Sequence, residues 1–359
     1  MKVVCLISSL QLGGAERQLS GLAVMLKGCG ADVEVLTYKD GDFYEEYLRS
    51  EGVEHVFIRK RGDLRLVRDI ASHLKDAGCD VLISFLAGTN IKACLVHKLY
   101  PSFRLIVSER IFNTRCMPHD LLRFLLYREA SAVVCNNHSQ EGFIRRYASA
   151  LAPGLVTIPN FVDTDLFAPG DCARRTDAPV IIVTARLSAR KNPGGLVRAA
   201  GILKREGLEF TVRWFGVTSR DARRLEALES LCRDEDVEDR FHFLPASRSV
   251  AEEYRASDIF CLPSFYEGTS NSLAEALSSA LVPVCSRVGD NVRYVTDGVN
   301  GFLFDPHDAG SIADALRRAI KLGHDGRTEY GARCRELAVE MLGKNAFRKA
   351  WTALLGMVD

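Results

Sequence analysis

Residues 263–277 read PSFYEGTSNSLAEAL and follow an apolar segment, residues 259–262, that is typical of a buried strand. Glu267 is therefore expected at a strand end, and small polar residues separate it from a helix that carries a second carboxylate, Glu275. Free backbone N–H groups and the dipole at such a helix start attract phosphate. Carboxylates on either side accept hydrogen bonds from sugar hydroxyls. We expect this stretch to bind a molecule with both a pyrophosphate and sugars, a nucleotide-sugar.

The same residues also permit a purely structural interpretation. Ser272 and Glu275 have the spacing of a capping box, in which Ser and Glu side chains stabilise a helix start without any ligand. The stretch alone leaves both interpretations open, so the decision depends on the rest of the chain.

Length and composition narrow the choice of protein class. The chain has 359 residues, which fits two domains better than one, and its 47% hydrophobic and 26% charged residues are typical of a soluble globular protein. A net charge of +1 gives no general attraction to nucleic acid or to an acidic membrane. Eleven cysteines without C-x-x-C spacing predict reduced thiols, and residues 1–7 indicate a strand rather than a signal peptide. With no run of about 18 apolar residues, we expect a cytoplasmic protein without a membrane-spanning helix.

Short apolar runs alternate with amphipathic segments, a pattern typical of parallel sheets covered by helices. The alternation runs from residue 3 to about 160 and starts again at residue 180. A polar connector rich in Pro, Gly, Asp and Arg, from Ala168 to Pro179, indicates the linker. The predicted fold class is α/β, with two doubly wound Rossmann-like domains that bind ligands at the carboxyl ends of their strands.

Two further motifs suit phosphate binding. Gly13 and Gly14 follow the first expected strand, where they let the backbone approach a phosphate or sugar, and the sequence there is not the G-x-G-x-x-G of dehydrogenases. Arg186 and Lys191 follow the first strand of the second half and suit a pyrophosphate, with Arg190 as a candidate substitute. Taken alone, each motif also fits a tight turn or a solvated loop. No histidines have zinc-ligand pairing, and Arg and Lys suit the neutralisation of phosphate charge, so no metal is expected.

These elements occur together in a familiar order. The Gly13–Gly14 loop, the Arg186 and Lys191 pair, residues 263–275 and the turn at residues 297–301 resemble the retaining GT-B glycosyltransferases of family 4, the group 1 glycosyltransferases. The resemblance spans nearly the whole chain and is strongest over residues 180–305. It implies two Rossmann-like domains facing a central cleft. Residues 1–165 would form the acceptor domain, with helix 345–359 packing back on it, and residues 170–344 the nucleotide-sugar donor domain.

The resemblance also implies roles for individual residues. Arg186 and Lys191 would hold the pyrophosphate and Glu267 would lie near the donor sugar, which makes these three the expected catalytic residues. Glu275 would accept hydrogen bonds from the ribose. The other expected donor-binding residues are Gly13, Gly14, Gly268, Thr269, Ser270, Asn271, Ser272 and Leu273.

The chain departs from its relatives after residues 105–107, where many of them have a His. Here Ser108, Glu109 and Arg110 follow, so Arg110 takes that place, and Glu109 and Arg110 are candidates for the acceptor or active site. Further departures near Gly216 and Leu244 leave the nucleotide base open. The expected substrate is a UDP-sugar ahead of a GDP-sugar or an ADP-sugar, with no other cofactor.

The sequence thus predicts a metal-independent glycosyltransferase that moves a sugar, with retention, to a hydroxyl of a glycan or lipid-linked saccharide in surface polysaccharide or glycoconjugate synthesis. Two alternatives stay open: an inactive sugar-nucleotide-binding subunit, and a GT-B enzyme of different chemistry such as an epimerase. The expected partners are the donor and the saccharide acceptor, not nucleic acid, and the oligomeric state is open. A basic cluster suits either peripheral contact with the inner face of the membrane or a solvated surface; it comprises Arg59, Lys60, Arg61, Arg65 and Arg68.

Overall fold

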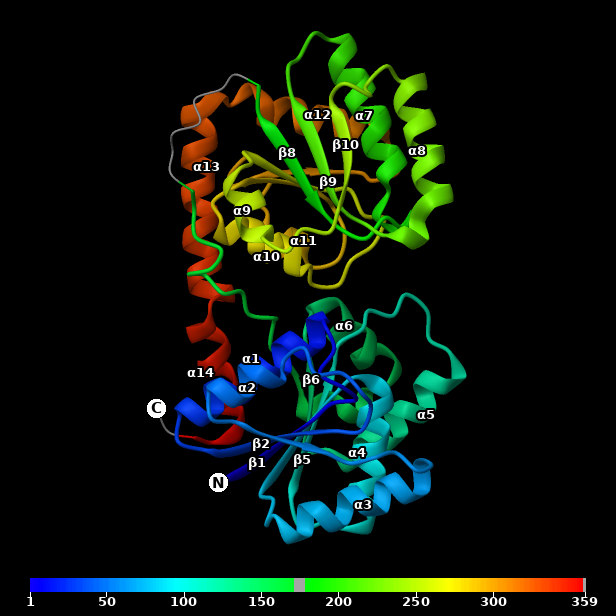
Figure 1. Ribbon diagram of the computed structural model, residues 1–359, viewed down its shortest axis with the longest axis vertical. Coiled ribbons are helices and arrows are strands. Elements are labelled where there is room, and N and C mark those ends of the chain that lie inside the picture. Colours follow the sequence, from blue (N-terminus) through cyan, green and yellow to red (C-terminus); the bar gives the residue numbers. More distant parts are fainter. Residues whose placement is uncertain (171–177, 358–359) are drawn as a thin grey trace. The chain divides into compact units, whose positions relative to one another are not determined.

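The computed structural model describes residues 1–170 and 178–357, which divide into two compact units. The first unit contains residues 1–160 and the segment from Phe347 onward, and the second contains residues 161–346. Each unit carries one parallel sheet flanked by helices (Figure 1). The predicted fold class, α/β with two Rossmann-like parallel-sheet domains, is confirmed.

The sheet of the first unit has the strand order β3-β2-β1-β4-β5-β6-β7 within the described residues. Val3 pairs with Val33 on one side and Val81 on the other, and such apolar strands stay buried on both faces. The strands are β1 (Lys2–Leu6), β2 (Asp32–Thr37), β3 (Glu54–Phe57), β4 (Val81–Phe85), β5 (Arg104–Glu109), β6 (Ala132–Cys135) and β7 (Leu155–Thr157).

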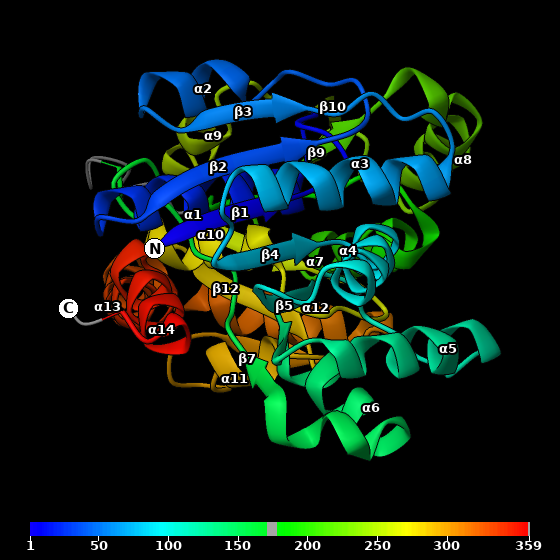
Figure 2. The ribbon, with the colours of Figure 1, turned by 90° about the horizontal axis from the view of Figure 1, so that it is seen from below.

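Helices cover both faces of this sheet. On one face, Leu66 and Ile70 of α3, Cys94 of α4, Phe124 of α5 and Ile144 of α6 join one apolar core with residues of the strands. Figure 2 shows α3 and α4 lying across the sheet. The helices of the unit are α1 (Gly14–Gly28), α2 (Glu45–Ser50), α3 (Asp63–Asp76), α4 (Ala87–Leu99), α5 (Pro118–Leu126) and α6 (His138–Tyr147), with short helical turns η1 (Tyr127–Glu129) and η2 (Ser149–Gly154).

The C-terminal helix α14 (Lys344–Leu355) completes the first unit. Its Trp351 is fully buried and stacks on Phe85 of β4, with ring centroids 6.2 Å apart. Burying an indole of this size anchors the end of the chain to the N-terminal sheet. The last two residues of the predicted helix, 358 and 359, lie outside the described residues.

The sheet of the second unit has the order β10-β9-β8-β11-β12-β13 among the described strands. The central strands β8 and β11 pair in parallel, so the loops that follow them emerge at the same edge of the sheet. The strands are β8 (Val180–Thr184), β9 (Thr211–Val217), β10 (Phe241–Pro245), β11 (Ile259–Leu262), β12 (Val282–Ser286) and β13 (Phe302–Phe304).

Two apolar cores lie on the two faces of this sheet. Residues of α7, α8 and α12 form one core, which includes the buried Trp214 of β9, and residues of α9, α10 and α13 form the other. The helices are α7 (Pro193–Arg205), α8 (Ala222–Asp234), α9 (Val250–Arg255), α10 (Asn271–Ser278), α11 (Asn291–Tyr294), α12 (Ala309–Lys321) and α13 (Gly323–Leu337). Helical turns η3 (Ala189–Lys191), η4 (Ser219–Asp221) and η5 (Ala338–Leu342) complete the unit.

The chain enters the second unit at Phe161, before the polar connector predicted from Ala168 to Pro179. Val162 and Phe167 are buried in the core of the second unit, and the backbone N–H of Val162 donates to the carbonyl of Leu342 over 2.8 Å. These apolar side chains hold the segment to the second unit ahead of the polar residues. Residues 171–177 of the predicted connector lie outside the described residues.

Most of the described cysteines lie inside the two units, and all ten of them are free thiols. Cys5 lies on β1 and Cys135 on β6, and Cys261 and Cys285 lie on the neighbouring strands β11 and β12. Burial raises the pKa of all four thiols, that of Cys5 to about 12. These thiols are therefore neutral and enclosed at physiological pH.

Candidate functional site

The loops after β8 and β11 meet at the carboxyl edge of the second sheet. The backbone N–H of Phe265, in the loop after β11, donates to the carbonyl of Arg190, in the loop after β8, over 2.9 Å. This bond brings together the two stretches that the sequence marked separately, residues 185–192 and residues 263–275.

Lys191 and Glu267 form the central ion pair of this edge. The Lys191 ammonium lies 2.5 Å from Glu267 Oε1, and the side chains are only 14% and 6% exposed. A charge-assisted hydrogen bond of this kind fixes both groups in a largely desolvated place. The ammonium has three N–H donors, so it can keep Glu267 and still bind another acceptor.

Asn192 holds Lys191 in place from the next position. It has a left-handed backbone with φ of 53° and caps α7, because its Oδ1 accepts the N–H of Gly195 over 3.1 Å. Its Nδ2 donates to the carbonyl of Pro306 over 2.8 Å. Asn tolerates this backbone conformation better than most residues. The sequence analysis did not select Asn192, although an Asn before a Pro at a helix start was a readable signal.

The cations of the same loop differ in their surroundings. Arg186 is exposed, and its side chain takes part in no ion pair among residues 1–170 and 178–357. The guanidinium of Arg190 lies 5.5 Å from the centre of the Tyr266 ring, so this candidate substitute is engaged by an aromatic face. The predicted pair of Arg186 and Lys191 therefore consists of one solvated cation and one cation already bound to a carboxylate.

Gly289 supports the loop that carries Glu267. A Cβ at Gly289, whose φ is 54°, would lie 2.0 Å from the carbonyl oxygen of Glu267. Next to it, the N–H of Asp290 donates to the carbonyl of Gly268 over 3.3 Å, and Thr269 Oγ1 lies 3.4 Å from Asp290 Oδ2. Only glycine combines this backbone with so close an approach. The sequence analysis had assigned residues 288–291 no role in the site.

The helix start at α10 corrects one expectation. Ser270 is the N-cap, and its Oγ accepts from the N–H of Leu273 over 3.4 Å. Ser272 instead lies within the first turn and contacts Ser270 Oγ at 2.9 Å. The capping-box alternative for Ser272 and Glu275 is wrong, because the helix begins two residues earlier than that pattern requires.

Residues 268–273 thus surround a helix N-terminus, as an anion site requires. Asn271 is the first residue of α10 and Ser272 the second. The side chain of Leu273 is buried in the core, so only its backbone faces the helix start. The predicted donor-binding residues of this stretch are contiguous in space, with the small and polar ones outside the core.

Glu275 lies inside the helix and is only 7% exposed. Tyr254 of α9 donates to its Oε2 over 3.3 Å. The same hydroxyl lies 3.2 Å from the carbonyl of Ser272 and 2.5 Å from Thr184 Oγ1, at the end of β8. Tyr254 therefore connects Glu275 to the loop side of the sheet, a role that only the three-dimensional arrangement reveals.

Gly13 and Gly14 form the start of α1 in the first unit. Gly13 is the N-cap with an extended backbone, and Gly14 is the first helical residue. A Cβ at Gly13 would lie 2.1 Å from Glu16 Oε2, because the Glu16 side chain folds back over the helix start. A side chain at Gly13 would therefore displace the end of the flexible Glu16 side chain from this turn.

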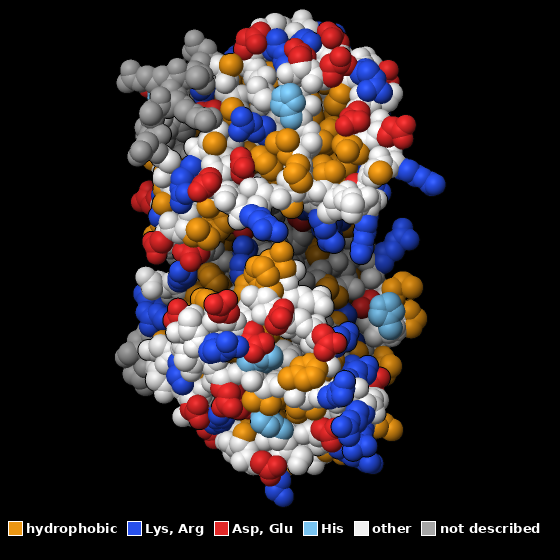
Figure 3. Space-filling view, in the orientation of Figure 1, with side chains coloured by type: hydrophobic (Ala, Val, Ile, Leu, Met, Phe, Trp, Pro, Cys, Tyr) orange, Lys and Arg blue, Asp and Glu red, His pale blue; other side chains and the backbone are white. Residues whose placement is uncertain are grey.

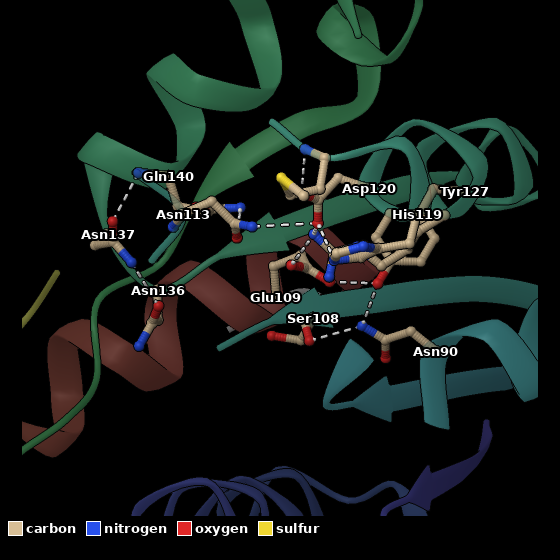
Figure 4. Close-up of polar contacts among 12 residues, drawn as sticks. Asn90, Ser108, Glu109, Asn113, His119, Asp120, Tyr127, Asn136, Asn137 and Gln140 are labelled. Atoms are coloured by element: carbon tan, nitrogen blue, oxygen red, sulfur yellow. Dashed lines mark hydrogen bonds and ion pairs between the residues drawn. The ribbon is translucent and has the colours of Figure 1, made fainter. Parts of the chain in front are cut away.

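Glu109 lies at the end of β5, in a fully enclosed network (Figure 4). Tyr127 donates a short hydrogen bond to Glu109 Oε1, and Arg123 Nη2 lies 3.5 Å from Oε2. Asn90 donates to the Tyr127 hydroxyl over 3.1 Å, and Asp120 lies 3.0 Å from Arg123. Burial raises the pKa of Glu109, and the charge of Arg123 opposes that rise. The structure thus turns this predicted site carboxylate toward Tyr127 and Arg123.

The network continues along the loop after β5. Asn113 Nδ2 donates to Asp120 Oδ1 over 3.2 Å, and Asn113 and Gln140 exchange two hydrogen bonds of 2.9 and 3.2 Å. Gln140 lies in α6, whose N-cap Asn137 accepts from the Gln140 N–H over 2.7 Å. Figure 4 shows these side chains pointing toward one another from separate elements. The loop after β5 is thereby fixed to α5 and α6.

Across residues 1–170 and 178–357, no three His, Cys, Asp or Glu side chains are grouped so that they could hold a metal ion. No described helix has both the length and the hydropathy needed to span a membrane.

Comparisons with known proteins agree with this arrangement. Residues 12–166 match the family described as Glycosyltransferase Family 4, and residues 169–338 match Glycosyl transferases group 1. A D-inositol 3-phosphate glycosyltransferase of Xylanimonas cellulosilytica is 31% identical over 210 residues, which cover 54% of this chain and 49% of that protein. The chain therefore spans about half the length of this relative.

Two further comparisons extend over more of the chain. EpsF of Bacillus subtilis is 24% identical over 317 residues, which cover 79% of each chain. The crystal structure of HepE of Anabaena in complex with UDP is similar with a TM-score of 0.86 at 17% identity, over 99% of this chain and 100% of that one. At so low an identity, this likeness establishes the fold.

Proposed function

The chain belongs to the GT-B glycosyltransferases, and from this premise we propose that it transfers a sugar from a nucleotide-sugar to an acceptor hydroxyl with retention at the anomeric carbon. The proposed donor is a UDP-sugar, and the proposed reaction needs no metal ion. The observation that carries the proposal is the Lys191–Glu267 pair, held 2.5 Å apart beside the N-terminus of α10.

The leaving group is the part of the donor that this edge suits best. Transfer breaks the bond between the anomeric carbon and a phosphate oxygen, so negative charge grows on the diphosphate. The α10 N-terminus, Lys191 and the exposed Arg186 supply positive charge at this edge of the second unit. Lys191 can donate to the diphosphate without leaving Glu267, because its ammonium has three donors.

The two carboxylates suit the two sugars of the donor. Glu267, in the loop after β11, would accept hydrogen bonds from the transferred sugar. Glu275, in α10, would accept them from the ribose. Tyr254 orients Glu275 through its 3.3 Å hydrogen bond. In this proposal the departing phosphate takes the proton of the acceptor hydroxyl, so no protein base is required.

We further propose a glycan or lipid-linked saccharide as the acceptor and a cytoplasmic enzyme that contacts the membrane peripherally. Leu121, Leu122 and Leu125 of α5 are exposed, as is Leu64 of α3. The basic cluster of residues 59–68 is exposed beside Leu64, and both α3 and α5 pack on α4. Figure 3 shows hydrophobic and basic side chains gathered along this edge of the first unit. Leucines next to cations suit an acidic lipid surface.

A thermal-shift screen with UDP, GDP, ADP and their sugars tests the donor. Ligand at about 100 times its Kd stabilises the folded state by about 2.7 kcal/mol, a shift that is readily measured. We expect UDP and one UDP-sugar to raise the melting temperature, and the same UDP-sugar to be hydrolysed slowly without an acceptor. Binding without hydrolysis or transfer would indicate an inactive subunit, and no shift with any nucleotide would contradict the proposal.

A further inference from the structure

Arg110 is a cation without a carboxylate partner in the described chain. It follows β5, and its Nη1 donates to Asn160 Oδ1 over 2.6 Å while its guanidinium rests 3.9 Å from the centre of the Phe85 ring. Its Nε and Nη2 are enclosed and have no hydrogen-bond partner within residues 1–170 and 178–357. One side of the guanidinium is thus fixed by contacts, and the other side is unsatisfied.

The two unsatisfied nitrogens form one edge of the guanidinium plane. Nε and Nη2 carry two parallel N–H groups, the arrangement that binds two oxygens of a carboxylate or phosphate at once. Asn160 and Phe85 engage the rest of the group, so the edge points in one direction. Such an edge is prepared for an oxyanion.

The neighbouring acidic groups of the first unit are committed elsewhere. Glu109 precedes Arg110 and faces the opposite side of the strand, where Tyr127 and Arg123 bind it. Asp120 also pairs with Arg123. Cys135, on the adjacent strand β6, supplies no anion either, because burial raises the pKa of its thiol and keeps it neutral.

The charge on Arg110 persists despite its surroundings. Burial lowers the pKa of Arg110 to about 9, so the group is still protonated at neutral pH. An enclosed cation with unsatisfied N–H groups is unfavourable until an anion binds. Arg123 also has enclosed nitrogens without a hydrogen-bond partner, but its charge is paired with Glu109 and Asp120, whereas Arg110 has no carboxylate partner among the described residues.

We propose that the Nε–Nη2 edge of Arg110 binds an oxyanion of the acceptor, a phosphate ester or a carboxylate on the saccharide that receives the sugar. This inference rests on the proposed glycosyl transfer and identifies the class of acceptor. The carboxyl end of β5 is where a parallel sheet of this kind binds its ligands. Arg110 then selects charged acceptors over neutral ones of the same shape.

The test measures binding of anionic probes to enzyme saturated with UDP, so that the diphosphate site is filled. The probes are inorganic phosphate, myo-inositol 1-phosphate and glucuronate, with myo-inositol and glucose as their neutral counterparts. The variants are Arg110→Gln, which removes the charge, and Arg110→Lys, which keeps the charge but loses the fork. Arg104→Gln is the matched control, because Arg104 lies at the start of β5, is exposed, and its side chain donates to Ser131 Oγ over 3.1 Å.

We expect at least one anionic probe to bind the wild type and the Arg104→Gln control equally, and about tenfold or more weaker to Arg110→Gln. Arg110→Lys should fall between them, and UDP affinity should be the same in all four proteins. The melting temperature of Arg110→Gln should change little, since removing an enclosed and partly unsatisfied cation offsets the lost contacts with Asn160 and Phe85. A wild-type protein that does not bind UDP would contradict the proposed function. With UDP bound normally, failure of every anionic probe to bind, or equal binding to Arg110→Gln, would overturn this inference.

Discussion

Two buried carboxylates follow parallel strands in different units and have very different partners. Glu109 is the last residue of β5, and Glu267 lies in the loop after β11. In the loop that leads to the start of α10, Glu267 contacts one ammonium, that of Lys191. Glu109 is enclosed by Tyr127 and Arg123, which is itself held by Asp120. The first carboxylate has a partner that can bind a further group, and the second lies in an enclosed network in which Arg123 also contacts Asp120.

The difference teaches that position at a strand end does not make a carboxylate a ligand group. Parallel sheets bring polar residues to one edge, but the partners decide between binding and stability. We infer that Glu109 stabilises the first unit and holds the loop after β5. Its neighbour Arg110 lies outside these ion pairs, with Nε and Nη2 unsatisfied.

The largest effect is expected at Glu109. Glu109→Ala leaves Arg123 and Tyr127 buried without their shared acceptor, and breaking a buried pair costs about 3–5 kcal/mol of the free energy of unfolding. Trp351 is in the first unit and Trp214 in the second, so a Trp214→Phe background lets fluorescence report the first unit alone. The control Glu129→Ala removes a carboxylate paired with the half-exposed Lys98, and should cost about 1 kcal/mol or less. Equal losses in the two variants would show that Glu109 does not stabilise the first unit through this network.

The next effect concerns catalysis at Lys191. Lys191→Ala should lower kcat by about 10²-fold or more, because the cation acts on charge that grows as the nucleotide leaves. Arg186→Ala should also lower kcat, and the two effects should be non-additive since both residues serve one anion. Steady-state kinetics with Arg198→Ala, an exposed cation of α7, as control will measure this. An unchanged kcat with a raised KM would show that Lys191 only binds the donor.

A smaller effect is expected at Glu275. Glu275→Gln keeps an oxygen for the Tyr254 hydroxyl but loses the charged acceptor, so nucleotide affinity should fall about tenfold. Stability should change by about 1 kcal/mol or less, since Gln fits the same space. Calorimetry with UDP and melting curves of the unliganded protein separate the two quantities, with exposed Glu252→Gln as the control. Undiminished affinity would remove Glu275 from the donor site.

The smallest effect is expected from removing metals. EDTA should leave most of the transferase activity, because Lys191, Arg186 and a helix N-terminus supply the positive charge for the diphosphate. The assay compares initial rates with and without chelator. Complete loss of activity that magnesium or manganese restores would show that a metal ion shares this work.

Much of the fold was readable from the sequence, because apolar runs of strand length recur between helical segments. The boundary between the units was harder to place. The polar residues of the connector indicated a linker, yet Val162 and Phe167 ahead of them are buried in the second unit. Two apolar side chains in a short segment carry too little periodicity to show which core receives them.

The site was readable as a list of residues but not as a set of contacts. The Lys191–Glu267 pair joins positions 76 residues apart and depends on the left-handed backbone of Asn192 and on the missing side chain of Gly289. The capping-box alternative at Ser272 stayed open because Ser270 and Ser272 are equally good caps in sequence, and only the helix start distinguishes them.

The enclosed cysteines allow the local opening of each unit to be followed separately. A thiol that is neutral and shielded reacts with an alkylating reagent only after the surrounding structure opens. Cys5 and Cys135 lie in the first sheet, and Cys261 and Cys285 lie in the second. Mass spectrometry of the labelled peptides would therefore measure the opening rate of each unit separately, in one chain without substitutions. Bound nucleotide should slow the labelling of Cys261 and Cys285 more than it slows the labelling of Cys5.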